Sequence, residues 1–419
     1  MRFLLLFFPL IGTLNGSPLL VDVSAESAIL INADTGCILF EKKPHAKLFP
    51  ASITKIATVA YTLKVKGDEL DELIAAQQDC IGSVTEEAKQ RSNYSLPSHW
   101  LVTDSSHMGI KRDEILSLRD LLYGILVASA DDAANVVAYT IGKGSVPTFM
   151  EQLNAYIKKL GCKDTYFNNP HGLHHPLHVT TAYDMALITK AALKNPCFRE
   201  MVSTSRFIRP KTNKQESTIL VQTNRLLRAG EFYYSKAIGV KTGRTSKAGN
   251  TFVAAATEAD RTLIAVLLNV KERKDIFRDA IRLFDAAFEQ PKTEKTLIPA
   301  GNQKYAIEVQ GAEKALKTYT DEDVTLSYYD AEKPKIKAYL EWNPLVLPIH
   351  KGQKVGNLHL KSEDHKLVKS ISLLAQEEVN GKWGLQIVRG FKNKGLKVLL
   401  MIGFIGLTVC AIYFVSRRR

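Results

Sequence analysis

The order of the predicted secondary-structure elements constrains this chain more than any other feature of its sequence. Residues 27–43, "SAILINADTGCILFEKK", predict two short strands joined by a turn at 33–36. A largely helical middle follows, and "AIGVKTG", "NTFVAAATEA" and "RTLIAVLLNV" then predict three consecutive strands before a helix over residues 274–288. Strands at both ends of a helical segment predict one α+β domain whose sheet is built from both ends of that segment.

The helical middle carries start and stop signals. A helix is expected from Ser52 to about residue 67, followed by a polar, irregular surface excursion over residues 80–110. "SLRDLLYGILVAS" then predicts a helix that a turn at residues 129–131 interrupts before "DAANVVAYTI" continues it. "PTFMEQLNAYIKKLG" predicts a further helix, with a proline near its start and a glycine just past its end.

The character of the sequence changes after Gln290 and Pro291. Residues 293–385 consist of short alternating runs separated by turns, such as "KYAIEV", "VTLSYYD" and "IKAYLEW". No long helical pattern interrupts these runs. We therefore expect a small all-β domain after a first domain over residues 18–290, and either a spacer or a docking role suits it.

Both ends of the chain indicate export and a membrane anchor. Residues 1–17 combine one basic residue, an apolar run and small or polar residues, which is the layout of a secretory signal peptide. A buried N-terminal segment is the alternative. Near the other end, Val398 to Val415 carries no charge and is about as long as a bilayer span requires, so residues 396–416 predict a transmembrane helix. Three arginines, residues 417–419, predict a cytoplasmic tail.

Composition narrows the class of partner. The formal net charge is +13 over 419 residues, but the basic residues are scattered and no nucleic-acid-binding module is recognisable, so nucleic acid is not an expected partner. An anionic surface such as a cell wall or a membrane fits this charge better. The five cysteines have no metal-ligand spacing and are expected as buried small hydrophobic side chains, with at most two disulfides between them.

One candidate catalytic pair stands at the start of the first helix, in "FPASITKIATVAYTL". Ser52 and Lys55 are three residues apart, so on a helix they share a face and the lysine can reach the serine hydroxyl. A serine at a helix start is also the usual N-cap, but that reading leaves the lysine unexplained. A neutral lysine can instead take the serine proton and make the hydroxyl a nucleophile, while the helix N-terminus stabilises a developing oxyanion.

Two further motifs accompany this pair. "SAD", residues 129–131, lies in the turn between two helices, so the Ser129 hydroxyl can point into a cleft. "KTG" lies on a predicted strand, where Lys241 could hold a carboxylate, Thr242 could hydrogen-bond it and Gly243 lets a substrate backbone approach. Each motif alone is commonplace, whereas all three in this order are hard to obtain by chance.

The three motifs together resemble those of the penicillin-binding proteins and serine β-lactamases. Four segments narrow the resemblance to the low-molecular-mass D-alanyl-D-alanine carboxypeptidases, spread over residues 27–270: "PASITKIAT", "DLLYGILVASADDAANVVA", "LGCKDTYFNNPHGL" and "GVKTGRTSKAGNTFVAAA". The resemblance implies a penicillin-binding or serine β-lactamase-like catalytic domain, with an antiparallel sheet flanked by helices. It also implies an anchored enzyme of the bacterial inner membrane whose ectodomain faces the periplasm or exterior.

The resemblance also implies a role for each motif residue. Ser52 would attack the carbonyl between two D-alanines, Lys55 would take its proton, and Ser129 would relay a proton to the leaving amine. Lys241 would bind the terminal carboxylate, and the backbone N–H groups of Ser52 and Arg244 would form the oxyanion hole. Water would then hydrolyse the acyl-enzyme. The implied partners are peptidoglycan stem peptides, with β-lactam antibiotics as inhibitors, and no metal or organic cofactor is implied.

One position departs from the family pattern. The family usually has asparagine two residues after the middle serine, and this chain has Asp131. An amide donates and accepts hydrogen bonds, whereas an ionised carboxylate only accepts and favours the ammonium form of Lys55. A protonated Asp131, or a charge shared with Lys241, would weaken this preference for the ammonium form and let Lys55 act as a base. The hypothesis is an active enzyme with slow turnover or an alkaline-shifted optimum.

Three alternatives remain from the sequence. A β-lactamase would need a base for the deacylating water, commonly a glutamate between the second and third motifs, and "NNPHGLHHPLH" carries none. A binding protein that lost catalysis through Asp131 could still hold stem peptides through Lys241 and Thr242. Metal binding would need a helix that places four histidines on one face, and the glycine and prolines among them argue against a helix: His171, His174, His175 and His178.

Overall fold

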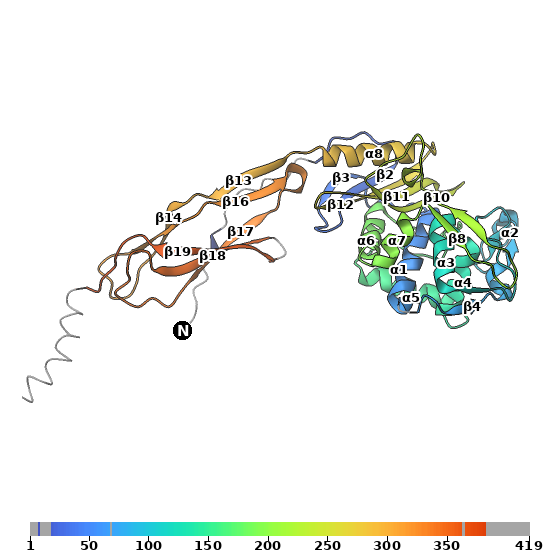
Figure 1. The fold of residues 1–419 in the computed structure, drawn as a ribbon, viewed down its shortest axis with the longest axis horizontal. Coiled ribbons are helices and arrows are strands. Elements are labelled where there is room, and N and C mark those ends of the chain that lie inside the picture. The colour runs from blue at the N-terminus through green and yellow to red at the C-terminus, as the bar shows by residue number, and fades with distance from the viewer. Residues whose placement is uncertain (1–6, 9–17, 68, 363–364, 383–419) are drawn as a thin grey trace, which may run out of the picture. The chain divides into compact units, whose positions relative to one another are not determined.

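The structure is a computed structural model that describes residues 7–8, 18–67, 69–362 and 365–382 (Figure 1). The chain divides into two compact units, one formed by Ser17–Gln290 and the other by Met1–Gly16 with Pro291–Arg419. We call the first the α+β unit and the second the β unit. Each has its own hydrophobic core, and each is described by itself below.

The α+β unit is built on a five-stranded antiparallel sheet, as the order of the predicted strands indicated. Its strand order is β10-β11-β12-β2-β3, so the first and last strands of the unit are neighbours. In the register of β12 with β2, Leu263 pairs with Asn32 and Leu268 with Ser27. The strands are β2 (Ser27–Asn32), β3 (Ile38–Lys42), β10 (Ala237–Thr245), β11 (Gly249–Glu258) and β12 (Arg261–Val270).

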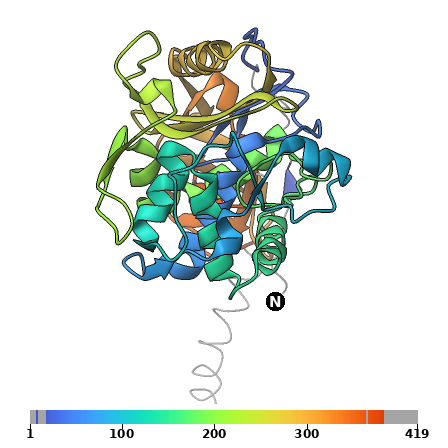
Figure 2. The same cartoon turned by 90° about the vertical axis from the view of Figure 1, so that its right-hand side faces the viewer.

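Helices cover both faces of this sheet. Helix α8 (Asp275–Phe288) packs on β11 and β12 from one side, and α6 (Ala182–Ala192) and α7 (Pro196–Ser203) pack from the other (Figure 2). Because both faces are covered, β12 is buried over almost its whole length, and its residues 263–268 form a continuous apolar run. The predicted strands 237–270 and the predicted helix 274–288 are confirmed.

Helix α1, which the sequence predicted from Ser52, packs against α4, α5, α6 and α7. Side chains at helix starts explain where several helices begin: the hydroxyls of Ser117, Ser145 and Thr181 accept from backbone N–H groups at the starts of α3, α5 and α6. The other helices are α1 (Lys55–Lys66), α2 (Glu86–Arg91), α3 (Leu118–Tyr123), α4 (Asp131–Ile141) and α5 (Val146–Lys159), with η1 (Ala51–Thr54), η2 (Gln78–Ile81), η3 (Gly124–Ala128) and η4 (Arg225–Leu227).

Short two-stranded pieces complete the α+β unit. They pair β4 (Leu73–Ala75) with β7 (Ile115–Ser117), β5 (Ser83–Val84) with β6 (Leu101–Val102), and β8 (Arg206–Arg209) with β9 (Thr218–Val221). No disulfide joins any two of the four cysteines in the described residues, and two of them, Cys80 and Cys162, are buried as expected of small hydrophobic side chains. The disulfides that the sequence left open are therefore not formed among these four.

The β unit is all-β, as its alternating runs predicted, with one short 3₁₀ turn, η5 (Asp330–Glu332). A six-stranded sheet has the order β1-β17-β18-β19-β15-β14, and β13 pairs with β16. Its core is apolar and includes Leu316, Val355 and Leu358. The strands are β1 (Phe7–Phe8), β13 (Lys292–Ile298), β14 (Gly301–Ile307), β15 (Leu316–Thr320), β16 (Val324–Tyr329), β17 (Ile336–Trp342), β18 (Lys354–Ser362) and β19 (Leu367–Ala375).

The predicted terminal segments fall largely outside the described residues. Apart from Phe7–Phe8 in β1, this holds for the signal peptide over 1–17, and it holds for all of the transmembrane segment over 396–416 and the tail over 417–419. Within the part of the chain that the structure describes, no helix has both the length and the apolar character needed to cross a bilayer.

Candidate active site

Ser52 lies in η1, directly before α1, and its side chain is partly exposed. Its neighbours hold the backbone in an unusual shape, because Ala51 has a φ of +52°. The Thr54 hydroxyl donates to the Ala51 carbonyl at 2.9 Å, and the Thr251 hydroxyl on β11 donates to the Pro50 carbonyl at 2.8 Å. These bonds tie the segment before the serine to the sheet and fix where its hydroxyl stands.

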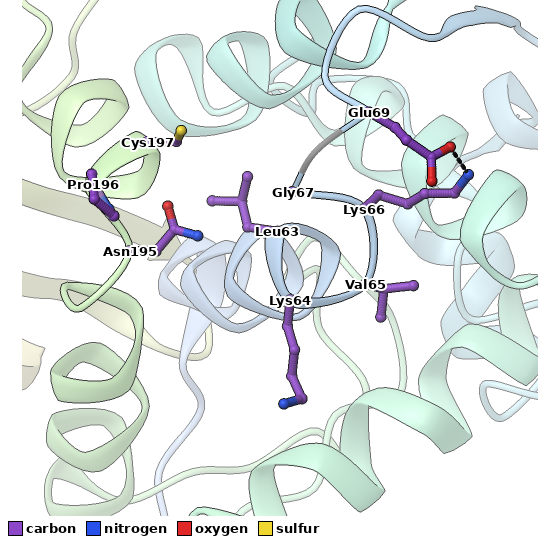
Figure 3. Close-up of a pocket in the computed structure, with 9 residues that line it drawn as sticks. All are labelled: Leu63, Lys64, Val65, Lys66, Gly67, Glu69, Asn195, Pro196 and Cys197. Carbon is purple, nitrogen blue, oxygen red and sulfur yellow. Dashed lines mark hydrogen bonds and ion pairs between the residues drawn. The ribbon is translucent and has the colours of Figure 1, made fainter.

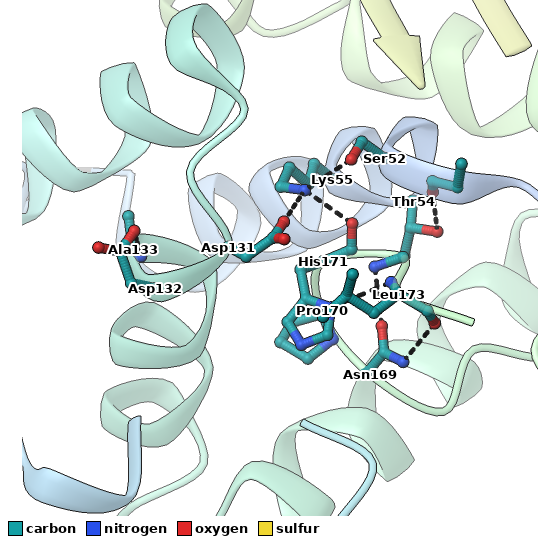
Figure 4. A network of polar contacts seen from close by, with 12 residues as sticks. Ser52, Thr54, Lys55, Asp131, Asp132, Ala133, Asn169, Pro170, His171 and Leu173 are labelled. Carbon is teal, nitrogen blue, oxygen red and sulfur yellow. Dashed lines mark hydrogen bonds and ion pairs between the residues drawn. The ribbon is translucent and has the colours of Figure 1, made fainter. Parts of the chain in front are cut away.

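Lys55 begins α1 one turn after the serine, as the spacing predicted, and its side chain is fully buried. Its Nζ lies 3.0 Å from Ser52 Oγ, 2.5 Å from Asp131 Oδ1 and 2.7 Å from the His171 carbonyl oxygen (Figure 4). The structure therefore brings together the serine, the lysine and the unexpected aspartate. The His171 carbonyl is a third partner that no side-chain motif predicts.

The turn between η3 and α4 supplies Asp131 and Ser129. Ser129 ends η3 with φ 64° and ψ 31°, and α4 then starts at Asp131, which reproduces the predicted interruption. The Asp131 backbone N–H donates to the Ser106 carbonyl at 2.8 Å. Ser129 is buried, and within the described part of the chain no hydrogen bond joins its hydroxyl to Ser52 or Lys55.

The "KTG" motif lies on β10, the edge strand of the sheet, and passes directly beside the serine. A Cβ atom at Gly243 would stand 2.8 Å from the Ser52 backbone nitrogen, so only glycine lets the strand run this close. Lys241 is fully buried and its Nζ donates to the Thr242 carbonyl at 2.9 Å. The Thr242 hydroxyl donates to Thr223 Oγ1 at 2.8 Å. Farther along the strand, the side chain at position 244 is exposed.

The segment "NPHGL" closes the site from another side. Gly172 has a φ of +96°, and a Cβ there would stand 1.9 Å from the Ala51 carbonyl oxygen, so this contact requires glycine. Pro170 supplies a carbonyl that accepts from the Thr58 hydroxyl on α1 at 2.6 Å. The segment thus packs its backbone against both η1 and α1, and places the His171 carbonyl at the lysine.

Two histidines of this stretch are neutral structural groups. His171 Nδ1 accepts from the Leu173 N–H, so Nε2 carries the proton and donates to the His99 carbonyl at 3.0 Å. His178 Nδ1 accepts from a backbone N–H as well, and its Nε2 then donates to Thr54 Oγ1 at 2.9 Å. Among the described residues, no group of three or more histidine, cysteine or acidic side chains is placed to hold a metal ion.

Burial sets the electrostatics of the site. It lowers the pKa of Lys55, against the opposing effect of the adjacent Asp131 carboxylate, and it raises the pKa of Asp131. Burial and the positive charge of Lys55 together hold the pKa of Lys241 well below its ordinary value. Burial also lowers the pKa of His178 to about 3. The buried ionisable groups of the site are therefore all shifted towards their uncharged forms.

Several residues that shape the site were not singled out from the sequence. Thr54 and Thr251 hold the segment before the serine, and Thr223 contacts the "KTG" strand. Threonines have no spacing signature of their own, and Thr223 is separated from Thr242 by a 3₁₀ turn and a loop. Only the fold brings these hydroxyls to the motif residues.

A surface pocket of about 310 Å³ lies elsewhere, lined by residues 63–67, 69 and 195–197 (Figure 3). It stands at the C-terminal end of α1, where Lys66 Nζ pairs with Glu69 Oε2 at 2.5 Å. Because Ser52 precedes the other end of this helix of 12 residues, a length of roughly 18 Å separates the pocket from the serine. The pocket is not part of the candidate active site.

Comparison with protein families matches both units. Residues 14–272 match the family model for D-alanyl-D-alanine carboxypeptidase, which accounts for more than half of the chain. Residues 293–381 match the model for the C-terminal domain of penicillin-binding protein 5. The order of the two matched regions follows the order of the two units.

Individual relatives are similar over most of the chain. The D-alanyl-D-alanine carboxypeptidase DacF of Bacillus subtilis is 31% identical over 354 residues, covering 83% of this chain and 84% of that protein. DacD of Escherichia coli is 29% identical over 358 residues, covering 84% and 86%. Penicillin-binding protein 5 from Haemophilus influenzae is a similar solved structure, with a TM-score of 0.58 and 25% identity over 87% of this chain and all of that one.

Proposed function

Because the chain belongs to the D-alanyl-D-alanine carboxypeptidase family, we propose that it is a serine hydrolase that removes the terminal D-alanine from peptidoglycan stem peptides. The single observation that carries this proposal is the 3.0 Å contact of Lys55 Nζ with Ser52 Oγ beside the glycine of the edge strand β10. A serine with a buried amine at hydrogen-bond distance is a nucleophile with its base. The adjacent strand edge offers an extended peptide a place to lie.

In the proposed reaction Ser52 Oγ attacks the carbonyl carbon between the two D-alanines while its proton passes to Lys55 Nζ. Ser129 relays a proton to the leaving amine from the turn before α4. The peptide C–N bond breaks, D-alanine leaves, and an ester remains on Ser52. Water then attacks the ester, and the proton returns to the serine. Positioning and charge, rather than a cofactor, supply the catalysis.

The substrate is held along β10 in this proposal. Lys241 and Thr242 bind the terminal carboxylate, Gly243 admits the peptide backbone, and Asp131 borders the same space. The backbone N–H groups of Ser52 and Arg244 receive the oxyanion. This assignment is supported by the closeness of Gly243 to the Ser52 nitrogen, since it sets the strand against the nucleophile. A β-lactam would acylate the same serine.

The β-lactamase alternative is not favoured. Efficient hydrolysis of a β-lactam ester needs a base for the attacking water, and the segment 168–178 beside the site carries no acidic side chain. The relatives named above are carboxypeptidases or a penicillin-binding protein. The binding-protein alternative rests on Asp131 alone, and it predicts that a penicillin leaves Ser52 unmodified.

The remaining parts of the organisation are proposed from the sequence. Residues 1–17 direct export, 18–290 form the catalytic domain and 293–385 a spacer or docking domain. Residues 396–416 anchor the protein in the inner membrane, and 417–419 remain in the cytoplasm. The bacterial relatives support an enzyme that acts on the cell wall. Membrane fractionation would test the anchor: detergent, but not high salt, should release the full-length protein from bacterial membranes. A protein that lacks residues 396–419 should no longer be found in the membrane fraction.

Two reactions of the purified full-length chain test the catalytic proposal. The chain is incubated with a fluorescent penicillin and, separately, with diacetyl-Lys-D-Ala-D-Ala, and mass spectrometry locates the label. Label on Ser52 together with release of D-alanine is expected. Label without release would mean a different natural substrate, and absence of both in a folded protein would favour a binding module. Sustained turnover of nitrocefin would instead indicate a β-lactamase.

A further inference from the structure

Asp131 is the one motif residue that departs from the family pattern, and its carboxylate contacts the proposed base directly. Lys55 Nζ has three oxygen partners: Ser52 Oγ at 3.0 Å, Asp131 Oδ1 at 2.5 Å and the His171 carbonyl at 2.7 Å. Both the lysine and the aspartate are buried, so water does not take the place of the aspartate at the amine. The number of hydrogens on Nζ therefore decides which of the three oxygens receive an N–H bond and whether a lone pair remains. The inference that follows rests on the function proposed above.

An ammonium group matches the observed contacts. It has three N–H bonds and no lone pair, so it donates once to each of its three partners. In this state Asp131 is a carboxylate and the pair is an ion pair. Lys55 then donates to the Ser52 hydroxyl and cannot take its proton. The geometry is thus that of a resting site.

Moving the proton from the lysine to the aspartate oxygen that contacts it does not free the lysine to act as a base. A proton on Asp131 Oδ1, which lies 2.5 Å from Nζ, would be donated to the Lys55 lone pair. The two remaining N–H bonds would serve Ser52 and the His171 carbonyl, and the lone pair would still be turned away from the serine. A protonated Asp131, the first of the two rescues that the sequence suggested, therefore frees the lysine only if its proton sits on Oδ2, and acylation would then not vary between pH 6 and pH 9.

One further state frees the lone pair. When the pair as a whole has lost its proton, the neutral amine donates its two N–H bonds to Asp131 and the His171 carbonyl. Its lone pair then faces Ser52 at 3.0 Å and can accept the hydroxyl proton. Acylation follows: the O–H bond of the serine breaks, its proton moves to Nζ, and Oγ bonds to the substrate carbonyl carbon.

We propose that Asp131 is a positioning residue that holds Lys55 in a proton-loaded resting state, so that acylation of Ser52 requires the pair first to release one proton to solvent. An asparagine at this position would accept one N–H bond through its oxygen but carry no negative charge to retain the proton. The substitution therefore sets the pH range in which the enzyme works. It does so without changing the nucleophile or the base.

The surroundings of the pair bear on how readily its proton leaves. Positive groups facing it oppose its retention, whereas a neighbouring carboxylate favours it. Burial lowers the pKa of Lys55 and raises that of Asp131, which moves the proton within the pair without removing it. The charged and titratable groups that act on the pair come from β10, α2, α4 and the "NPHGL" segment: Lys241, Lys89, Asp132, which points away from the pair (Figure 4), and His171 in its neutral form.

The test is the pH dependence of acylation by a fluorescent penicillin, measured from pH 5.5 to 10 on the full-length chain. For the unaltered protein we expect the second-order rate constant to rise about tenfold per pH unit on its acidic side. Asp131→Asn should move this rise down by at least one pH unit, so that at low pH the variant acylates at least about tenfold faster. Asp104→Asn, which removes an exposed carboxylate elsewhere, should follow the unaltered profile.

Each other outcome has a defined meaning. If the acylation rate depends on pH in the same way for Asp131→Asn and for the unaltered chain, the inference is wrong. It is also wrong if the acylation rate of the unaltered chain does not change between pH 6 and pH 9, and this second result requires no variant. If D-alanine is released while the profiles coincide, the inference fails and the proposed function stands. If folded protein neither takes up label nor releases D-alanine at any pH, both fail.

Discussion

The two units differ most in what they bury. The α+β unit encloses ionisable side chains, among them Lys55, Lys241, Asp131 and His178. Within residues 291–362 and 365–382, the buried polar side chains are two threonines, Thr318 and Thr320, whose hydroxyls donate to backbone carbonyls. Burying a charge is costly unless it is paired or neutralised, whereas a bonded hydroxyl costs little.

This difference indicates which buried groups each unit needs for folding and which it holds for another purpose. The β unit has an apolar core, and its described part buries no acidic side chain, lysine, arginine or histidine, so its interior is explained by folding alone. The α+β unit tolerates groups that folding does not need, and it places them around one serine. Matched changes in the two units should therefore have different consequences, and the following four pairs test this from the largest expected effect to the smallest.

Serines give the largest contrast. Ser52→Ala should abolish acylation and lower D-alanine release at least about a thousandfold, because no other hydroxyl replaces the nucleophile. Ser370→Ala on β19, where the side chain is exposed, should leave both rates unchanged. Fluorescent penicillin labelling and a D-alanine assay measure both variants. Residual labelling of Ser52→Ala above a tenth of the normal rate would contradict the assignment.

Acid should unfold the α+β unit before the β unit. His178 has a pKa of about 3 when folded and an ordinary value of 6.5, so the unfolded chain binds more protons between these values. Stability is thus retained above pH 6.5 and falls between 6.5 and 3, by up to about 1.4 kcal/mol per pH unit. The described part of the β unit buries no histidine. Its stability should depend less on pH in this range.

Single-tryptophan variants separate the two transitions, because Trp100 lies in the α+β unit and Trp342 in the β unit. One variant keeps Trp100 and the other keeps Trp342, with phenylalanine at the remaining positions. Urea titrations followed by fluorescence at pH 7 and pH 4.5 should show a larger loss for Trp100. Equal losses at both reporters would mean that buried histidines do not distinguish the units.

Two glycines with similar backbone angles give a smaller contrast. Gly172 and Gly301 both have positive φ values, +96° and +101°, so alanine at either site should cost about 1 kcal/mol of stability from backbone strain. A Cβ at Gly301 meets nothing within 4 Å, whereas one at Gly172 would meet the Ala51 carbonyl at 1.9 Å. Gly172→Ala should therefore also lower acylation at least about tenfold. Equal activity of the two variants would show that the 51–52 segment adapts freely.

Buried threonines should give the smallest effects. Thr242→Val removes the bond to Thr223, and Thr318→Val removes the bond to the Tyr305 carbonyl, each worth about 1 kcal/mol. In the β unit this should appear only as lower stability. In the α+β unit we expect KM for the D-Ala-D-Ala peptide to rise about fivefold. Unchanged KM for Thr242→Val would remove this hydroxyl from the proposed carboxylate site.

The sequence predicted the elements whose periodicity is strong. Most strands of both sheets, the helix after Ser52 and the interrupted helix around residue 129 follow from alternation, apolar spacing and turn residues, whereas β1 lies in the predicted signal peptide. Helices α6 and α7 and the β8–β9 hairpin were not predicted. In the hairpin the large apolar side chains Ile208 and Ile219 are exposed, so its pattern does not indicate a core-facing strand.

The site was predictable only where its residues are close in sequence. Spacing alone places Lys55 within reach of Ser52, and the structure has them 3.0 Å apart. The approach of Asp131 to the same amine depends on how α4 packs against α1, which no local pattern encodes. The His171 carbonyl belongs to the backbone, and because every residue has a backbone carbonyl, the sequence does not show that this one contacts Lys55. The contacts of Lys55 with Asp131 and with the His171 carbonyl, which depend on tertiary packing, could therefore not be predicted from the sequence.

The pairing of β12 with β2 has a consequence for how the protein is made. Strand β2 leaves the ribosome early, yet its partner, with Leu263 opposite Asn32, is synthesised only after the whole helical middle. Contacts between segments so distant in the chain slow folding, since the long intervening loop must be closed first. The strands that complete the sheet include β10, which carries the "KTG" motif. A chain that is still being synthesised therefore has Ser52 but not the strand with the "KTG" motif, and the sheet and the candidate site can form only after β10, β11 and β12 have been made.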